Sequence, residues 1–260
     1  MSGRRHALGQ HFLADESFVH RTIELADLPP GASVLEVGPG KGALTLPLLD
    51  AGYQVTAVEF DRLLAERLAQ LALPRLQVEQ ADFLKFDLGD LPSGPMFVVA
   101  NLPYSTGTAI LSRLLELPEK FPRVVVMLQR EVAQRLVAQP GSRSYGSLSI
   151  FTQMQAEVQM GFPVPPEAFR PPPRVESAVV RLDLSVTPRH ACGRPGAFRR
   201  LVRSAFAQRR KTLRNSLGAV YGKEIALAAM ARAGIDPIRR AETVSIPEFC
   251  ELEAALGNDA

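Results

Sequence analysis

Short apolar runs alternate with longer stretches of helical periodicity over the first 184 residues of the chain. Short apolar runs between glycine, proline and polar residues are typical of buried strands, and apolar residues every three or four positions are typical of helices. The predicted strands are 34–37, 53–58, 76–80, 96–100 and 124–128, and the predicted helices are 17–28, 43–49, 62–71, 108–117 and 130–137. Strands 157–162 and 178–184 follow as a closing pair. This alternation predicts an α/β, Rossmann-like doubly wound sheet.

The pattern becomes helical after residue 184. From Gly196 onward one apolar stripe recurs at helical spacing and consists of Phe198, Leu201, Val202, Ala205 and Phe206. Another face of the same segment is expected to carry Arg199, Arg203, Arg210 and Arg214. Further helices are predicted at 224–233 and 246–256. We therefore expect a larger domain over residues 1–184 and a small helical domain over residues 185–260.

The charge of the chain is concentrated in that second part. Ten arginines and lysines and no acidic residue lie between Leu184 and Lys223, whereas the remainder holds 20 bases and 27 acids. Such a basic zone suggests a polyanionic partner, with Arg203, Arg210 and Arg214 as candidate phosphate contacts. The alternative is a solvated face in an arginine-rich protein.

Composition limits the class of protein. No apolar run approaches the roughly 20 residues needed to span a bilayer, and no apolar signal-peptide core follows the basic N-terminus. Cys192 and Cys250 lie far apart and not in a metal-ligand spacing. We expect a cytoplasmic protein with two reduced thiols and no metal, and we expect a monomer with no membrane partner.

A glycine-rich turn follows the first predicted strand and reads Gly38-Pro-Gly-Lys-Gly42. Glycine allows a sharp turn and lets a ligand approach the backbone at the carboxyl end of a strand. The spacing is not the Gly-x-Gly-x-x-Gly of dinucleotide sites. Gly38 and Gly40 therefore favour a nucleoside cofactor without pyrophosphate, for which S-adenosyl-L-methionine is the obvious candidate. A plain structural turn is the alternative.

Two acidic residues end the next two strands. Glu59 lies 21 residues after Gly38, where this fold places a carboxylate that accepts hydrogen bonds from ribose hydroxyls. Asp82 follows the third strand, where it could accept a hydrogen bond from the amino group of an adenine. The alternatives are a solvated strand end for Glu59 and a turn cap for Asp82.

The fourth strand runs into Asn101-Leu-Pro-Tyr104. Pro103 pushes Leu102 into an extended conformation, so that its carbonyl points outward. The Asn101 side-chain oxygen is a second acceptor, and the two acceptors can bind both hydrogens of an exocyclic amino group. Tyr104 offers a face on which a base can stack. This arrangement predicts methyl transfer to a base amine, although an ordinary turn is the alternative.

Two further residues are candidates on weaker grounds. A proline-rich loop, 164–174, could hold Phe169 over a pocket, although Phe169 in the core is the alternative. His11 lies in Gly9-Gln-His-Phe-Leu13, and by itself it is more often a polar residue beside a helix than a ligand.

Together these stretches resemble the ribosomal RNA adenine dimethyltransferase family, and most closely its small-subunit (KsgA) branch. The similar stretches extend over nearly the whole chain and are 9–13, 36–42, 101–104, 129–136, 169–179 and 206–213. The last of them, Phe-Ala-Gln-Arg-Arg-Lys-Thr-Leu, looks like the small-subunit branch.

The resemblance implies a class I S-adenosylmethionine-dependent methyltransferase. Its substrate would be two adjacent adenosines, dimethylated on N6, in the 3′-terminal hairpin loop of 16S rRNA, within the 30S subunit or its precursor during biogenesis. The family pattern implies a cofactor pocket of His11, Leu13, Gly38, Gly40, Glu59, Asp82 and Asn101. It also implies that Tyr104 and Phe169 sandwich the target base. His11 is a departure, because many relatives have asparagine there.

Two other functions share parts of the pattern. An antibiotic-resistance methyltransferase acting on large-subunit rRNA has the same catalytic half, and the 206–213 stretch argues against it. A non-catalytic assembly factor could retain the fold, and the intact Asn101, Pro103 and Tyr104 disfavour it. A cytosine-C5 methyltransferase is excluded, because no cysteine lies where its nucleophile is needed.

Overall fold

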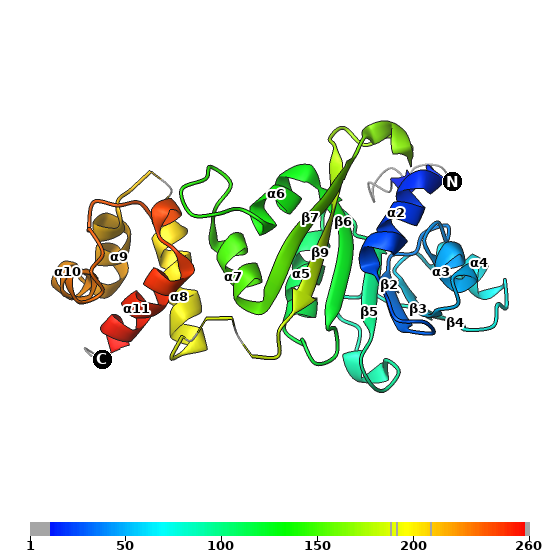
Figure 1. The fold of residues 1–260 in the computed structure, drawn as a ribbon, viewed down its shortest axis with the longest axis horizontal. Coiled ribbons are helices and arrows are strands. Elements are labelled where there is room, and N and C mark those ends of the chain that lie inside the picture. Colours follow the sequence, from blue (N-terminus) through cyan, green and yellow to red (C-terminus); the bar gives the residue numbers. More distant parts are fainter. Residues whose placement is uncertain (1–10, 188, 191, 209, 258–260) are drawn as a thin grey trace. The chain divides into compact units, whose positions relative to one another are not determined.

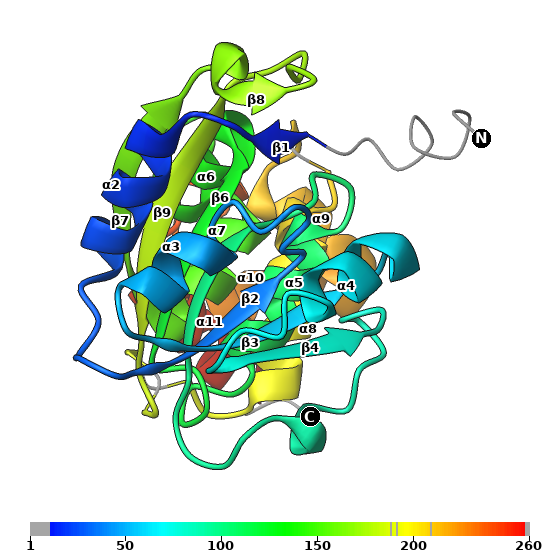
Figure 2. The ribbon, with the colours of Figure 1, turned by 90° about the vertical axis from the view of Figure 1, so that its right-hand side faces the viewer.

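The computed structural model describes residues 11–187, 189–190, 192–208 and 210–257 (Figures 1 and 2). The chain divides into two compact units, one with residues up to 133 and 156–186, the other with residues 134–155 and 187 onward. The observed division after residue 186 is close to the expected one after residue 184. Residues 134–155, however, belong to the second unit and not to the first. The reason is that Ile150 and Met154 of helix α7 (Ser147–Gln155) are buried in the core of the second unit.

The first unit is built on a seven-stranded sheet of order β4-β3-β2-β5-β6-β9-β7. Five strands are parallel: β2 (Ser33–Val37), β3 (Gln54–Glu59), β4 (Leu76–Gln80), β5 (Phe97–Asn101) and β6 (Arg123–Gln129). The last two, β7 (Ala156–Val164) and β9 (Ser177–Leu184), are antiparallel to their neighbours. This topology confirms the predicted Rossmann-like class and the closing strand pair.

Helices cover both faces of this sheet. Figures 1 and 2 show α2 (Glu16–Ala26), α3 (Thr45–Asp50) and α4 (Arg62–Ala69) on one face and α5 (Gly107–Leu115) on the other. A buried cluster joins the first three helices to the sheet, with Val19, Leu48 and Leu68 among its members. The strand order reverses between β2 and β5, so the carboxyl ends of these two strands flank the position where doubly wound sheets bind ligands.

The second unit is helical. It contains α7 and the helices α8 (Pro195–Phe206), α9 (Leu213–Tyr221), α10 (Lys223–Arg232) and α11 (Ile246–Gly257), and α6 (Arg130–Leu136) leads into it. The predicted apolar stripe of α8 is confirmed: Phe198, Leu201, Val202 and Ala205 are buried, and Phe206 is half-buried and packs against the same cluster.

The expectation that Arg210 and Arg214 share a helix face with Arg203 is wrong. Helix α8 ends at Phe206, and a new helix begins after Thr212, whose carbonyl accepts hydrogen bonds from the backbone N–H groups of Asn215 and Ser216. Arg203 therefore lies on α8, Arg210 in the connecting turn and Arg214 on α9.

The expectation of two free thiols is also wrong for this structure. Cys192 and Cys250 form a disulfide, with their Cα atoms 4.9 Å apart across 58 residues of sequence. The segment before α8 lies along α11 at this point, as the ion pair between Arg194 Nε and Glu253 Oε1 at 2.9 Å also shows. Because the two cysteines are far apart in the sequence, only the folded structure shows that they are neighbours. In the described part of the chain, no helix has both the length and the apolar character to cross a membrane.

Candidate active site

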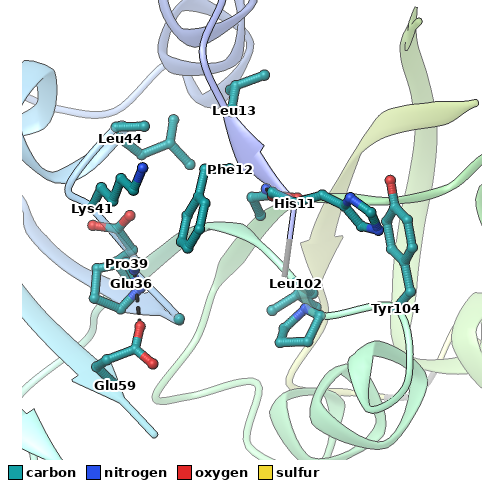
Figure 3. Close-up of a pocket in the computed structure, with 15 residues that line it drawn as sticks. His11, Phe12, Leu13, Glu36, Pro39, Lys41, Leu44, Glu59, Leu102 and Tyr104 are labelled. Carbon is teal, nitrogen blue, oxygen red and sulfur yellow. Dashed lines mark hydrogen bonds between the residues drawn. The ribbon is translucent and has the colours of Figure 1, made fainter. Parts of the chain in front are cut away.

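The glycine-rich loop after β2 forms one wall of a pocket at the switch point of the sheet (Figure 3). Gly38, Gly40 and Gly42 have φ angles of +73°, +60° and +87°, a left-handed region that side chains rarely enter. At Gly40 a Cβ atom would also lie 3.0 Å from the ring of Phe12. Glycine is therefore required here both for the turn and for the close approach of Phe12.

Glu59, the last residue of β3, forms a hydrogen bond to the backbone of this loop. Its Oε2 accepts a hydrogen bond from the Gly40 N–H at 2.9 Å, and its Oε1 accepts one from the Asp61 N–H at 2.8 Å. Glu59 is only 5% exposed, and this burial raises the pKa of its carboxyl group. Because a carboxylate has about four lone-pair sites, both oxygens keep capacity for hydroxyl groups of a ligand in the pocket.

The loop Asn101-Leu-Pro-Tyr104 forms the opposite wall. Asn101 ends β5, the Leu102 N–H donates to the Met127 carbonyl at 3.1 Å, and the Pro103 ring lies 3.8 Å from the position of a Cβ on Gly38. No donor within the described residues reaches the Leu102 carbonyl. The two loops predicted from the sequence therefore meet, and the second retains the acceptors expected of it.

Tyr104 is fixed at its outer end. Its hydroxyl lies 2.5 Å from Ser177 Oγ at the start of β9. Burial raises the pKa of the Tyr104 phenol, so the group is neutral at physiological pH. The ring is thereby held as a neutral aromatic surface at the edge of the pocket, as the stacking role requires.

The N-terminal segment closes the pocket through a short strand that the sequence pattern did not predict. Strand β1 (Phe12–Leu13) pairs antiparallel with β8 (Phe169–Arg170) and brings His11 and Leu13 into the pocket lining. Asn101 Nδ2 donates to the His11 carbonyl over a long 3.5 Å, and Lys41 Nζ lies 4.8 Å from the centre of the Phe12 ring. Strands of two residues carry too little periodicity to be predicted.

Glu36 is a site residue that the sequence reasoning did not single out. It lies on β2, is 2% exposed, and its Oε2 accepts a hydrogen bond from Thr45 Oγ1 at 2.6 Å. The pKa of Glu36 is raised to about 8, and burial is the largest cause. The hydrogen bond from Thr45 lowers the pKa, and the nearby Glu59 raises it further. An acidic residue inside an otherwise apolar strand was the available signal, because an unpaired carboxylate is costly to bury.

Two of the expected site residues do not line the pocket. Asp82 follows β4, and its Oδ1 accepts from the Leu84 N–H at 3.0 Å, which is the turn-capping alternative. Phe169 is completely buried in the core cluster with Leu13 and Val19, so its ring offers no face to a base beside Tyr104. The expectation that Phe169 forms the second half of a sandwich is wrong for this structure, because the β1–β8 pairing turns its side chain inward.

The fold and this pocket define a class I S-adenosylmethionine-dependent methyltransferase. The chain resembles the solved dimethyladenosine transferase from Plasmodium falciparum, with a TM-score of 0.78, 23% identity, and coverage of 93% of this chain and 96% of that one. It also resembles the 23S rRNA methyltransferase ErmE, with a TM-score of 0.72, 29% identity, and coverage of 95% and 99%. The first of these likenesses concerns the fold alone.

The sequence comparisons identify the family. The family model described as ribosomal RNA adenine dimethylase matches residues 1–257, and the chain belongs to this family. A protein of Syntrophotalea carbinolica named "Ribosomal RNA small subunit methyltransferase A" is 44% identical, over 94% of this chain and 93% of its own length. A protein of Dinoroseobacter shibae with the same name is 45% identical, over 95% and 89%.

The residues of the pocket suit the cofactor of this class. S-adenosylmethionine carries a sulfonium and an ammonium, and the pocket offers the acidic side chains of Glu36 and Glu59. The left-handed glycines expose backbone at the loop that lines it. The structure thus assembles His11, Leu13, Gly38, Gly40, Glu59, Asn101, Leu102 and Tyr104 in one site.

Proposed function

We propose that this enzyme is the small-subunit member of its family. It transfers methyl groups from S-adenosylmethionine to N6 of two adjacent adenosines in the 3′-terminal hairpin loop of 16S rRNA, in the 30S subunit or its precursor. The names of the relatives at 44% and 45% identity support this substrate, as does the stretch 206–213. We further propose that it acts as a cytoplasmic monomer.

The observation that carries the proposal is that the acceptor loop and the glycine loop share one pocket. When bound, S-adenosylmethionine supplies an electrophilic methyl group. Asn101 Oδ1 and the Leu102 carbonyl accept the two hydrogens of the adenine amino group and direct its lone pair. Tyr104 holds the base by stacking on its fixed ring. Because a conjugated amine is a poor nucleophile, this alignment contributes more than a strong general base would.

The cofactor would be held by residues of both loops and of β1. In this proposal His11 and Leu13 line its pocket, Gly38 and Gly40 present backbone to it, and Glu59 accepts hydrogen bonds from the ribose. Asp82 is proposed as the adenine contact through the carboxylate oxygen that does not cap its turn. The two glycines and the two acidic residues are supported by their place at the edge of the sheet where β2, β3 and β4 end, and His11 and Leu13 by their place in the pocket lining.

The test is methyl transfer from labelled S-adenosylmethionine to small subunits that lack the modification, with large subunits in parallel. We expect N6-dimethyladenosine in the small subunit alone. Label in large-subunit RNA would instead support the resistance-type function, which the likeness to ErmE makes the specific rival. Tight binding with no label in either subunit would support an assembly factor.

The basic zone is proposed to bind rRNA phosphates through Arg203, Arg210 and Arg214, all of which are exposed. Changing all three to glutamine is expected to weaken RNA binding and to lower the slope of log K against log salt by about two to three. Fluorescence anisotropy with the hairpin RNA over a salt series measures this slope. The double variant Arg62→Gln, Arg67→Gln on α4 is the control for a general loss of charge. An unchanged slope in the triple variant would show that these arginines do not contact RNA.

A further inference from the structure

Tyr104 has the ring on which a target base would stack, and His11 already lies against it. The centroids of the two rings are 5.7 Å apart, and their planes are inclined by 32°. Figure 3 shows the imidazole and the phenol side by side at the edge of the pocket. Such a distance is within the range of aromatic pairs that contribute measurably to stability.

Both rings are held in this arrangement by hydrogen bonds. The Tyr104 hydroxyl is bonded to Ser177 Oγ, and His11 Nδ1 lies 2.9 Å from the Pro171 carbonyl oxygen. Because a carbonyl oxygen only accepts, Nδ1 carries a proton and donates this hydrogen bond. His11 therefore contacts Tyr104 with an aromatic ring that carries nitrogen atoms and a hydrogen-bond donor on its edge, as a nucleobase does.

An imidazole is also the five-membered half of a purine. We propose that the His11 side chain occupies the position of the target adenine on Tyr104, so that the imidazole must move away before the base can stack. The inference rests on the proposed function, because it takes the Asn101–Tyr104 loop as the binding site for the base. In this proposal the His11 side chain competes with the target base for the Tyr104 ring, while the His11 backbone lines the cofactor pocket.

The structure allows this exchange at low cost. His11 and Pro171 directly flank the β1–β8 pair, in which Phe12 lies opposite Arg170 and Leu13 opposite Phe169. Rotation of the imidazole breaks the Pro171 bond and the ring contact and leaves the strand pairing intact. It also leaves the His11 carbonyl beside Asn101 Nδ2, so the amide that aligns the target amine keeps its orientation. With Phe169 buried, the imidazole is the ring that faces Tyr104 among the described residues of the pocket.

Three variants of the full-length protein test the exchange. His11→Ala removes the competing ring, His11→Phe keeps an aromatic ring at the position, and His20→Ala removes an exposed histidine on α2 as the control. The probe is the hairpin RNA with 2-aminopurine in place of a target adenosine, since its fluorescence changes when the base leaves the stack. KM for the unmodified small subunit and the Kd for S-adenosylmethionine are measured alongside.

His11→Ala is expected to lower both the Kd for the probe RNA and KM for the small subunit by about three- to tenfold, the amount expected for one displaced aromatic contact. His11→Phe is expected to leave these constants at the wild-type values or to raise them, and His20→Ala to match wild type. A higher or unchanged KM in His11→Ala would overturn the proposal, since a supporting or merely structural histidine cannot improve binding when removed. Absence of methylation by the wild-type protein would instead refute the proposed function.

Discussion

Asn101→Ala is expected to lower kcat for methyl transfer by about 100-fold or more, the usual loss when one group that stabilises the reacting centre is removed. Asn101 ends β5 and supplies one of the two acceptors of the loop, and the adjacent Leu102 carbonyl supplies the other. With one acceptor removed, the amino group keeps a hydrogen bond but loses the direction of its lone pair. The enzyme should therefore bind RNA and react slowly.

Single-turnover methyl transfer with saturating cofactor and RNA measures this loss directly. Asn101→Asp is the matched variant, because it keeps an acceptor oxygen at the same position, and its rate is expected to fall between those of wild type and the alanine variant. The Kd for S-adenosylmethionine should change less than the rate does. A rate for Asn101→Ala within a few-fold of wild type would show that alignment of the amine by this side chain does not drive the reaction.

The parts of the site that could be predicted from sequence are those whose chemistry is local. Gly38 and Gly40 lie in the turn that follows β2, and Asn101 is the last residue of β5, so a correct assignment of these two strands placed all three residues at one edge of the sheet. The sharp turn at Gly38 and Gly40, with positive φ angles at both, could be inferred because glycine is the residue that suits such a turn. Glu59 was found for the same reason, as a polar residue at a strand end.

The misses depended on contacts between segments that are distant in the sequence. Phe169 could be an exposed ring or a core residue from its proline-rich surroundings, and only its pairing with Leu13 through β8 decided the matter. Cys192 and Cys250 are 58 residues apart, and a helical fold brought them together. Helix α8 ends at Phe206 and α9 begins after Thr212, a break that the arginine spacing concealed.

Glu36 leads to the second large effect, which concerns stability. Its pKa is raised from 4.5 to about 8, mainly by burial. At pH values between these two, the folded protein keeps a proton on Glu36 that the unfolded chain has released. Stability from the neutral buried form is complete below the unfolded pKa and is lost as pH rises through the folded pKa. The free energy of unfolding should therefore fall by up to about 1.4 kcal/mol per pH unit, and by on the order of 3 kcal/mol in all between about pH 5 and pH 8.

Glu36→Gln is expected to remove this dependence. The amide oxygen can still accept the hydrogen bond from Thr45 Oγ1, and an amide cannot ionise. The variant should match wild type near pH 5 and exceed it by roughly 3 kcal/mol in free energy of unfolding near pH 8. Urea unfolding of the cofactor-free proteins at a series of pH values measures the difference, with exposed Glu119→Gln as the control for loss of a carboxyl group.

The cofactor provides an independent check on the same group. Glu36 lines the pocket, and a ligand with a sulfonium, an ammonium and one carboxylate carries a net positive charge, which favours the ionised form of Glu36 over the neutral acid. Saturation with S-adenosylmethionine should therefore flatten the pH dependence of wild-type stability and leave that of Glu36→Gln unchanged. Parallel curves for wild type and Glu36→Gln without cofactor would show that Glu36 is already ionised in the folded protein.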